Sequence, residues 1–108
     1  MTQSPGSSPL AEWHLYVIRT VDGFFYAGIS TDVQRRFKEH LAQGLKTAKY
    51  LRSHKPAELA FSLAVGGKGL ALKVEYRFKR LSKSAKARII ASGKMKFDPV
   101  TGKIRIRG

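Results

Sequence analysis

A small set of side chains in this sequence has the chemistry needed to cleave a phosphodiester bond. Tyr16 and Tyr26 lie ten residues apart, and Arg36, His40 and Glu75 follow them along the chain. A guanidinium binds phosphate oxygens in a planar fork. Phenols and imidazoles move protons, and a carboxylate can hold a hard cation such as Mg²⁺ or Mn²⁺. The set can act together only if the fold gathers it at one place.

The two tyrosines lie on either side of a turn. Segments 13–19 and 24–29 are rich in β-branched and aromatic residues and predict a β-hairpin. A two-residue loop would put the tyrosines on opposite faces of this hairpin. A three-residue loop, 21–23, with its glycine in the left-handed conformation, sets Tyr16 opposite Gly28 and makes the tyrosines diagonal neighbours on one face. We predict the three-residue loop.

Arg36 and His40 fall on a predicted helix. Thr31 or Asp32 can cap its start, and Gly44 is expected to end it. We expect Arg36 beside the buried side of the helix and His40 one turn later on its surface. From this segment alone, the adjacent residues Arg35 and Arg36 would be interpreted as part of a solvent-exposed helix face. Apolar residues at a spacing of four predict the buried stripe: Val33, Phe37 and Leu41.

The rest of the chain predicts an α/β fold with a small, mainly antiparallel three-stranded sheet flanked by about three helices. The third strand is expected over 58–65 and a long helix over 70–81, with a glycine-rich turn between them. A last helix follows, ended by Gly93. The alternating tail predicts an edge hairpin, a strand-like arm, or a segment that is disordered when no partner is bound. We divide the chain into a disordered leader, one folded domain and a basic C-terminal arm: 1–11, 12–92 and 93–108.

Composition limits the function. Lys and Arg number 21 against 7 Asp and Glu, a net charge of +14, and this favours a polyanionic partner, above all nucleic acid. Cysteine is absent, which excludes disulfides and thiolate zinc sites and is compatible with a cytoplasmic protein. The histidines lack metal-ligand spacing, and the glycine-rich turn lacks the pattern of a phosphate-binding loop. We expect no membrane association, no small-molecule cofactor and a monomer.

Glu75 stands alone among cations. Between Lys68 and Arg88 there are eight Lys or Arg residues and this one carboxylate. A carboxylate repels phosphate unless a hard cation bridges them, which would make Glu75 a metal ligand. The alternative is an i,i+4 ion pair with Lys79, and structural ion pairs are commoner than sites.

The order of these residues resembles the GIY-YIG nuclease family over residues 13–92, and most resembles its small stand-alone bacterial members. Leu15-Tyr16-Val17 is similar to the first motif and Tyr26-Ala27-Gly28 to the second. The helix over 31–40 matches the one that carries an essential arginine, placed at Arg36, and many members have a histidine where this chain has His40. Glu75 matches the single metal-binding glutamate.

The resemblance implies a catalytic site in which Glu75 holds one Mg²⁺ or Mn²⁺ and Arg36 neutralises charge on the phosphate. Tyr16 would take a proton from the attacking water, Tyr26 would orient water or phosphate, and His40 would assist. A tyrosine has a pKa near 10, and we expect the dense positive charge of the chain to lower the pKa of Tyr16.

We therefore expect a divalent-metal-dependent nuclease that hydrolyses DNA, in repair or processing, with non-specific or structure-dependent recognition; RNA is not excluded. The rival hypothesis is a non-catalytic nucleic-acid-binding module of the same fold, and a third is a basic protein of a ribonucleoprotein particle. Nine cations are the expected nucleic-acid contacts: Arg35, Lys46, Lys49, Arg52, Lys73, Arg77, Lys103, Arg105 and Arg107.

Overall fold

The computed structural model describes residues 11–106, so the predicted leader, apart from its last residue, and Arg107 lie outside the described residues. At the centre is an antiparallel sheet with the strand order β2-β1-β3, formed by β1 (Trp13–Thr20), β2 (Phe25–Ser30) and β3 (Pro56–Gly66). The predicted fold class is confirmed. No helix within 11–106 is long and apolar enough to cross a membrane.

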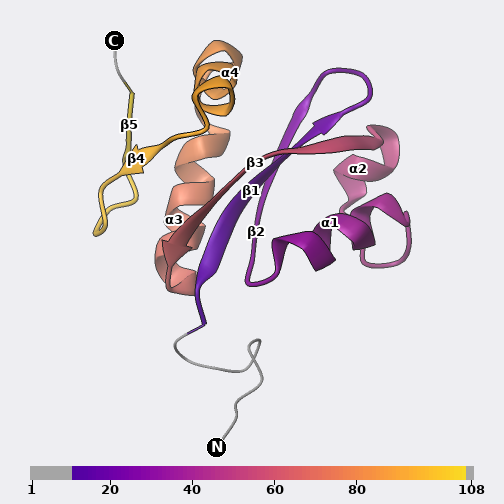
Figure 1. The fold of residues 1–108 in the computed structure, drawn as a ribbon, viewed down its shortest axis with the longest axis horizontal. Coiled ribbons are helices and arrows are strands. Elements are labelled where there is room, and N and C mark those ends of the chain that lie inside the picture. Colours follow the sequence, from indigo (N-terminus) through magenta and orange to yellow (C-terminus); the bar gives the residue numbers. More distant parts are fainter. Residues whose placement is uncertain (1–10, 107–108) are drawn as a thin grey trace, which may run out of the picture.

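Helices cover both faces of the sheet (Figure 1). On one face lie α1 (Val33–Leu41) and the short α2 (Lys49–Ser53), and on the other lie α3 (Lys68–Lys79) and α4 (Lys83–Ser92). The described part thus has four helices rather than about three, because the basic connector before β3 forms α2. A second, two-stranded sheet, β4 (Lys96–Phe97) and β5 (Ile104–Arg105), follows α4.

The β1–β2 turn has the predicted three-residue loop. Thr20 N donates to Phe24 O at 2.9 Å, and Gly23 has a φ of +86°, in the left-handed region that glycine tolerates. Tyr16 therefore pairs with Gly28, as predicted. The loop thus puts both tyrosines on one face of the hairpin.

Alternation along β1 divides the core into two clusters. Leu15 and Val17 point to the α3 and α4 face, where they join Val74 and Phe78. Tyr16 and Ile18, which alternate with them along β1, point to the other face, where Leu51 of α2 covers them. The chemistry-bearing Tyr16 is therefore buried among apolar side chains on the α1 and α2 face.

The predicted stripe of α1 is wrong at its third position. Leu41 is 47% exposed, while His40 is fully buried. A strict spacing of four residues drifts by about 40° per step around an α-helix, so the buried side passes from Val33 and Phe37 to residue 40 rather than 41. The helix also ends at Leu41, before Gly44, and the left-handed residue there is Gln43, with a φ of 55°.

The two-stranded tail is fastened to α3. Met95 and Ile104 are only 8% exposed and belong to the main core. Gly102 lies so close to α3 that a Cβ there would be 2.8 Å from Lys73 Cβ, and its φ of +75° also favours glycine. The hairpin predicted as one option for the tail is formed, and it lies beside α3 and α4 (Figure 1).

Candidate active site

The Tyr16 side chain lies across the backbone of Gly28. A Cβ on residue 28 would lie 2.4 Å from Tyr16 Oη and 2.6 Å from its Cζ, closer than real Cβ contacts. The phenol can thus extend over β2 only because residue 28 has no side chain. Its Oη lies 3.1 Å from Nε2 of His40, with both residues at most 1% exposed. The hydroxyl is therefore held in one position by packing and by a hydrogen bond.

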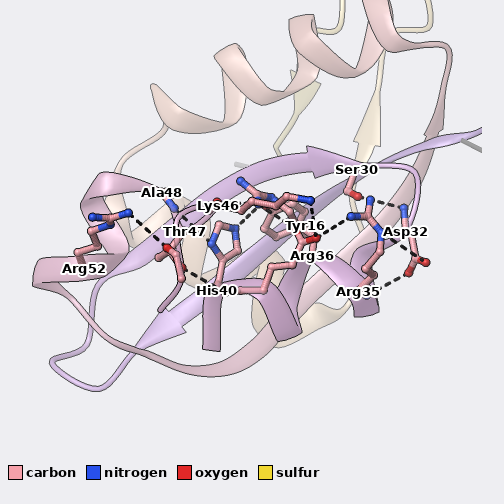
Figure 2. Close-up of polar contacts among 12 residues, drawn as sticks. Tyr16, Ser30, Asp32, Arg35, Arg36, His40, Lys46, Thr47, Ala48 and Arg52 are labelled. Carbon is pink, nitrogen blue, oxygen red and sulfur yellow. Dashed lines mark hydrogen bonds and ion pairs between the residues drawn. The ribbon is translucent and has the colours of Figure 1, made fainter. Parts of the chain in front are cut away.

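His40 supports this phenol from α1. Its Nδ1 lies 3.5 Å from the backbone N–H of Ala48, which can only donate, so the neutral ring carries its proton on Nε2 and donates to Tyr16 Oη (Figure 2). Burial, with the charge of Arg36, lowers the pKa of His40 to about 4. The prediction that His40 lies on the helix surface is wrong. The ring is instead a buried, neutral hydrogen-bond donor near neutral pH.

Arg36 lies next to this pair. Its Nη1 donates to Glu39 Oε1 at 3.0 Å and to the carbonyl of Lys46 at 2.8 Å (Figure 2). Partial burial disfavours its charge, but the hydrogen bonds to Glu39 and Tyr16 raise the pKa of Arg36. Its side chain remains 27% exposed. Arg36 is thus a fixed cation with one side open to solvent, rather than the wholly solvated residue that its sequence context alone favoured.

Tyr26 completes an aromatic group. Its ring centroid is 6.4 Å from that of Tyr16 and 5.7 Å from that of His40. On its other side Tyr50 of α2 stacks on it at 6.0 Å, and His54 stacks on Tyr50 at 4.5 Å. Tyr26 is therefore held between the buried phenol and α2.

The electrostatics of Tyr16 differ from the prediction. Burial, followed by the charge of Tyr26, raises the pKa of Tyr16 to about 12, although Arg36 acts in the opposite direction. The expectation that positive charge lowers this pKa is wrong for the protein alone, because desolvation outweighs it. Tyr16 is a neutral phenol near neutral pH.

Glu75 comes from the opposite side of the sheet but acts on the same hydroxyl. It lies on α3, which packs against β2, the strand that the Tyr16 phenol crosses. The Glu75 charge contributes, after burial and Tyr26, to the raised pKa of Tyr16. Its carboxylate is also 3.2 Å from Lys79 Nζ, so the alternative i,i+4 pair is formed, with the Glu75 side chain 19% exposed.

These residues fit a divalent cation only together with a substrate. Among residues 11–106 no group of three acidic, histidine or cysteine side chains could enclose a metal ion. Mg²⁺ commonly takes one or two carboxylates and completes its shell with water and phosphate oxygens. A single partly exposed carboxylate, whose charge reaches the Tyr16 phenol, agrees with such a site and with no preformed protein cage.

The predicted nucleic-acid contacts form two separate groups. Arg35, Lys46, Lys49 and Arg52 lie on α1, α2 and the loop between them, and Arg35 Nη1 pairs with Glu39 Oε2 at 2.8 Å. The other group lies across the molecule on α3 and the C-terminal hairpin (Figure 1). The fold therefore does not gather the predicted cations into one patch. The second group consists of Lys73, Arg77, Lys103 and Arg105, all exposed.

The sequence analysis did not predict two of the side chains that belong to the site. Glu39 bonds both Arg35 and Arg36, and its spacing of four and three residues from them on one helix was a usable signal. Tyr50 stacks on Tyr26 from a helix far along the chain, and no local pattern indicates that contact. Glu39 was thus predictable, whereas Tyr50 needed the tertiary structure.

The fold is a three-stranded sheet with helices on both faces, and its site is a phenol held over a glycine beside an arginine and a buried histidine. A family of enzymes shares this arrangement. The chain matches the GIY-YIG catalytic domain over residues 12–88 and belongs to this family of nucleases. It is 50% identical to a UPF0213 protein of Citrobacter koseri over 84 residues, 78% of this chain and 82% of the relative. It is 49% identical, with the same coverage, to the UPF0213 protein YhbQ of Escherichia coli O8.

Among solved structures, the chain is similar to the solution NMR structure of the UPF0213 protein BH0048 from Bacillus halodurans. The two share 34% sequence identity, with a TM-score of 0.48 and coverage of 75% of this chain and 84% of that one.

Proposed function

We propose that this protein is a divalent-metal-dependent nuclease that hydrolyses phosphodiester bonds of DNA in repair or processing. The observation that carries the proposal is the Tyr16 hydroxyl, which extends over Gly28, accepts a hydrogen bond from His40 and feels the charges of both Arg36 and Glu75. A cation and a carboxylate acting on one fixed phenol are the parts that phosphoryl transfer needs for charge neutralisation and positioning.

Each side chain has a definite role in this reaction. His40 donates its Nε2–H to Tyr16 Oη, which leaves the phenolic proton free to point at water or phosphate. The partly exposed Arg36 neutralises negative charge that develops on the phosphate. Tyr26, held by its ring contacts with Tyr16 and Tyr50, orients the attacking water or a phosphate oxygen.

Glu75 would hold the divalent cation, Mg²⁺ or Mn²⁺. Such an ion would supply positive charge to the site, which would favour the phenolate form of Tyr16 as a proton acceptor and offset negative charge on the phosphate. Glu75 Oε2 also pairs with Lys79 Nζ at 3.2 Å, so a cation that took both carboxylate oxygens would displace Lys79. This pair is only partly buried, so its loss costs about 0.3–0.5 kcal/mol.

The test is cleavage of fluorescent oligonucleotides in Mg²⁺, Mn²⁺ or EDTA, over single-stranded, duplex, flap and forked DNA. Glu75→Gln should lower the rate at least about 10²–10³-fold while DNA binding in EDTA is retained. The matched control is Glu58→Gln. It removes an exposed carboxylate of β3 that pairs with Arg19 of β1. Cleavage by Glu75→Gln at the parental rate would refute the ligand assignment.

A second candidate function is a DNA-binding module without turnover. The Glu75–Lys79 ion pair and the neutral Tyr16 phenol favour it, because Lys79 competes with a metal ion for the carboxylate and a neutral phenol is a poor base. Retention of DNA with no product in either metal, on any substrate of the panel, would favour the binder. Preference for RNA in a competition experiment would instead favour a role in a ribonucleoprotein particle.

A further inference from the structure

The outer side of α3 carries an exposed aromatic ring in a groove. The groove has a volume of about 510 Å³ and lies between α3 and the loop of the C-terminal hairpin. Tyr76 is 60% exposed, and Leu72, one turn earlier, is 47% exposed. Exposed apolar side chains gathered in one groove indicate a binding surface. The groove is lined by Leu72, Lys73, Tyr76, Arg77 and Thr101.

The charges around this ring are positive. The Arg80 guanidinium lies 5.5 Å from the Tyr76 ring centroid, and Lys73 and Arg77 line the groove itself. The carboxylate of the hairpin, Asp98, is turned to its own loop, where Oδ1 accepts from Val100 N at 2.8 Å and from Thr101 N at 2.9 Å. The groove therefore offers an aromatic face and cations to a ligand that is flat in one part and anionic in another.

We propose that Tyr76 is a stacking platform for an unpaired nucleobase, with the phosphates beside it held by Lys73 and Arg77. Aromatic platforms flanked by cations bind single strands, because every base has a face that can stack once it is not paired. Paired bases in a duplex are already stacked and cannot occupy the ring. The occupant is thus a single-stranded DNA segment.

The platform is continuous with the proposed active site. Tyr76 follows Glu75 on α3, and successive side chains point about 100° apart around a helix. A strand whose phosphate lies at Glu75 on the sheet side can therefore continue onto the outer side of the same helix turn. The inference rests on the proposed function in this respect only: it makes an unpaired strand next to the cleaved bond the preferred substrate.

Binding measurements test the platform without cleavage. Fluorescence anisotropy in EDTA with a labelled 15-nucleotide oligo-dT and a 15-base-pair duplex should show that Tyr76→Ala weakens single-strand binding by about 5- to 100-fold. Tyr76→Phe should bind within about 2-fold of the parent, because the stacking face remains. Tyr76→Leu, which keeps apolar area but no ring, should behave like the alanine variant. Duplex binding should not change in any of them.

Equal losses for single strand and duplex, or none for Tyr76→Ala, would overturn the platform. A Trp at position 76 reports stacking directly: in a Trp13→Phe background, which removes the one native tryptophan, Tyr76→Trp fluorescence should be quenched by oligo-dT. Binding without quenching would also overturn it. Every readout here is made in EDTA, so these results are independent of the cleavage assay. Absence of product in that assay would refute the nuclease, and the binding data would still decide whether Tyr76 is a platform.

Discussion

The contact between Tyr16 and Gly28 makes the sharpest prediction. In Gly28→Ala the new Cβ would lie 2.4 Å from Tyr16 Oη, whereas real Cβ contacts begin at 3.0 Å and ordinary contact at 3.4 Å, so the two atoms must separate by 0.6–1.0 Å, the differences between these values. The ring cannot move freely, since Tyr16 is 1% exposed and bonded to His40. Overpacking of this kind costs about 1–3 kcal/mol. A misplacement of about 1 Å in a catalytic group costs about 10²-fold in rate.

Two measurements check this. Urea or thermal unfolding should show the loss of stability, about 4–8 °C in Tm for each kcal/mol in a domain of this size. The cleavage assay should show the loss of rate under conditions where the variant is fully folded. Gly69→Ala is the matched control: it adds the same methyl group inside α3, where nothing lies within 4 Å. It should be neutral or stabilise the protein by up to about 1 kcal/mol.

A double-mutant cycle decides whether the effect acts through the phenol. In a Tyr16→Leu background there is no ring for the new methyl group to meet, so Gly28→Ala should then cost well under about 1 kcal/mol. If Gly28→Ala kept the parental stability and rate, the proposed fixing of the Tyr16 hydroxyl would be refuted. If it were equally harmful with leucine at position 16, the cause would be the backbone of β2 rather than the phenol.

The remaining predictions concern pH and salt. The pKa of His40 is lowered from 6.5 to about 4, so the unfolded chain takes up this proton first and stability should fall by roughly 2–3 kcal/mol as the pH drops from 6.5 to 4; unfolding of His40→Gln should lack this dependence. Because Tyr16 is a neutral phenol with a pKa of about 12 in the protein alone, cleavage that uses it as a base without help from the metal ion should accelerate up to about tenfold per pH unit from about pH 7 to 9. A flat profile would exclude that unassisted role. Five phosphate contacts would give a slope of about −4.5 in a plot of the logarithm of the duplex-binding constant against the logarithm of salt concentration. If Lys46 or Arg52 makes one of these contacts, its substitution by alanine should reduce the magnitude of the slope by about 0.9, and an unchanged slope would show that the residue does not contact a phosphate.

Much of the secondary structure that positions the site could be predicted, because the sequence patterns that specify it are local. The β-branched and aromatic residues of segments 13–19 and 24–29 predicted the hairpin, and the three-residue loop ending at Gly23 predicted its register, which puts Tyr16 opposite Gly28. Gly93 ends α4 as predicted, and the Ser82 side chain caps its start, since a cap and a left-handed residue depend on near neighbours. The prediction that Leu41 is buried on α1 was wrong, because a spacing of four residues only approximates the 3.6-residue turn of a helix.

The protonation of the site could not be predicted in the same way. The charge of +14 suggested a phenol with a lowered pKa, yet the pKa of Tyr16 is raised to about 12. Charge can be counted from residue types, but desolvation depends on what covers a group. Here Leu51 of α2 and His40 of α1 cover the hydroxyl, and neither contact can be read from a local pattern.

The sequence by itself determined the elements, the pairing of β1 with β2 and the residue types available for phosphate chemistry, because turn geometry, strand alternation and caps act over a few residues. Only the tertiary structure decided that Tyr16 is buried and neutral, that His40 donates to it from inside the core, and that Glu75 acts on it from the other side of the sheet. Burial and electrostatics at one point in space depend on segments that meet only after the chain has packed.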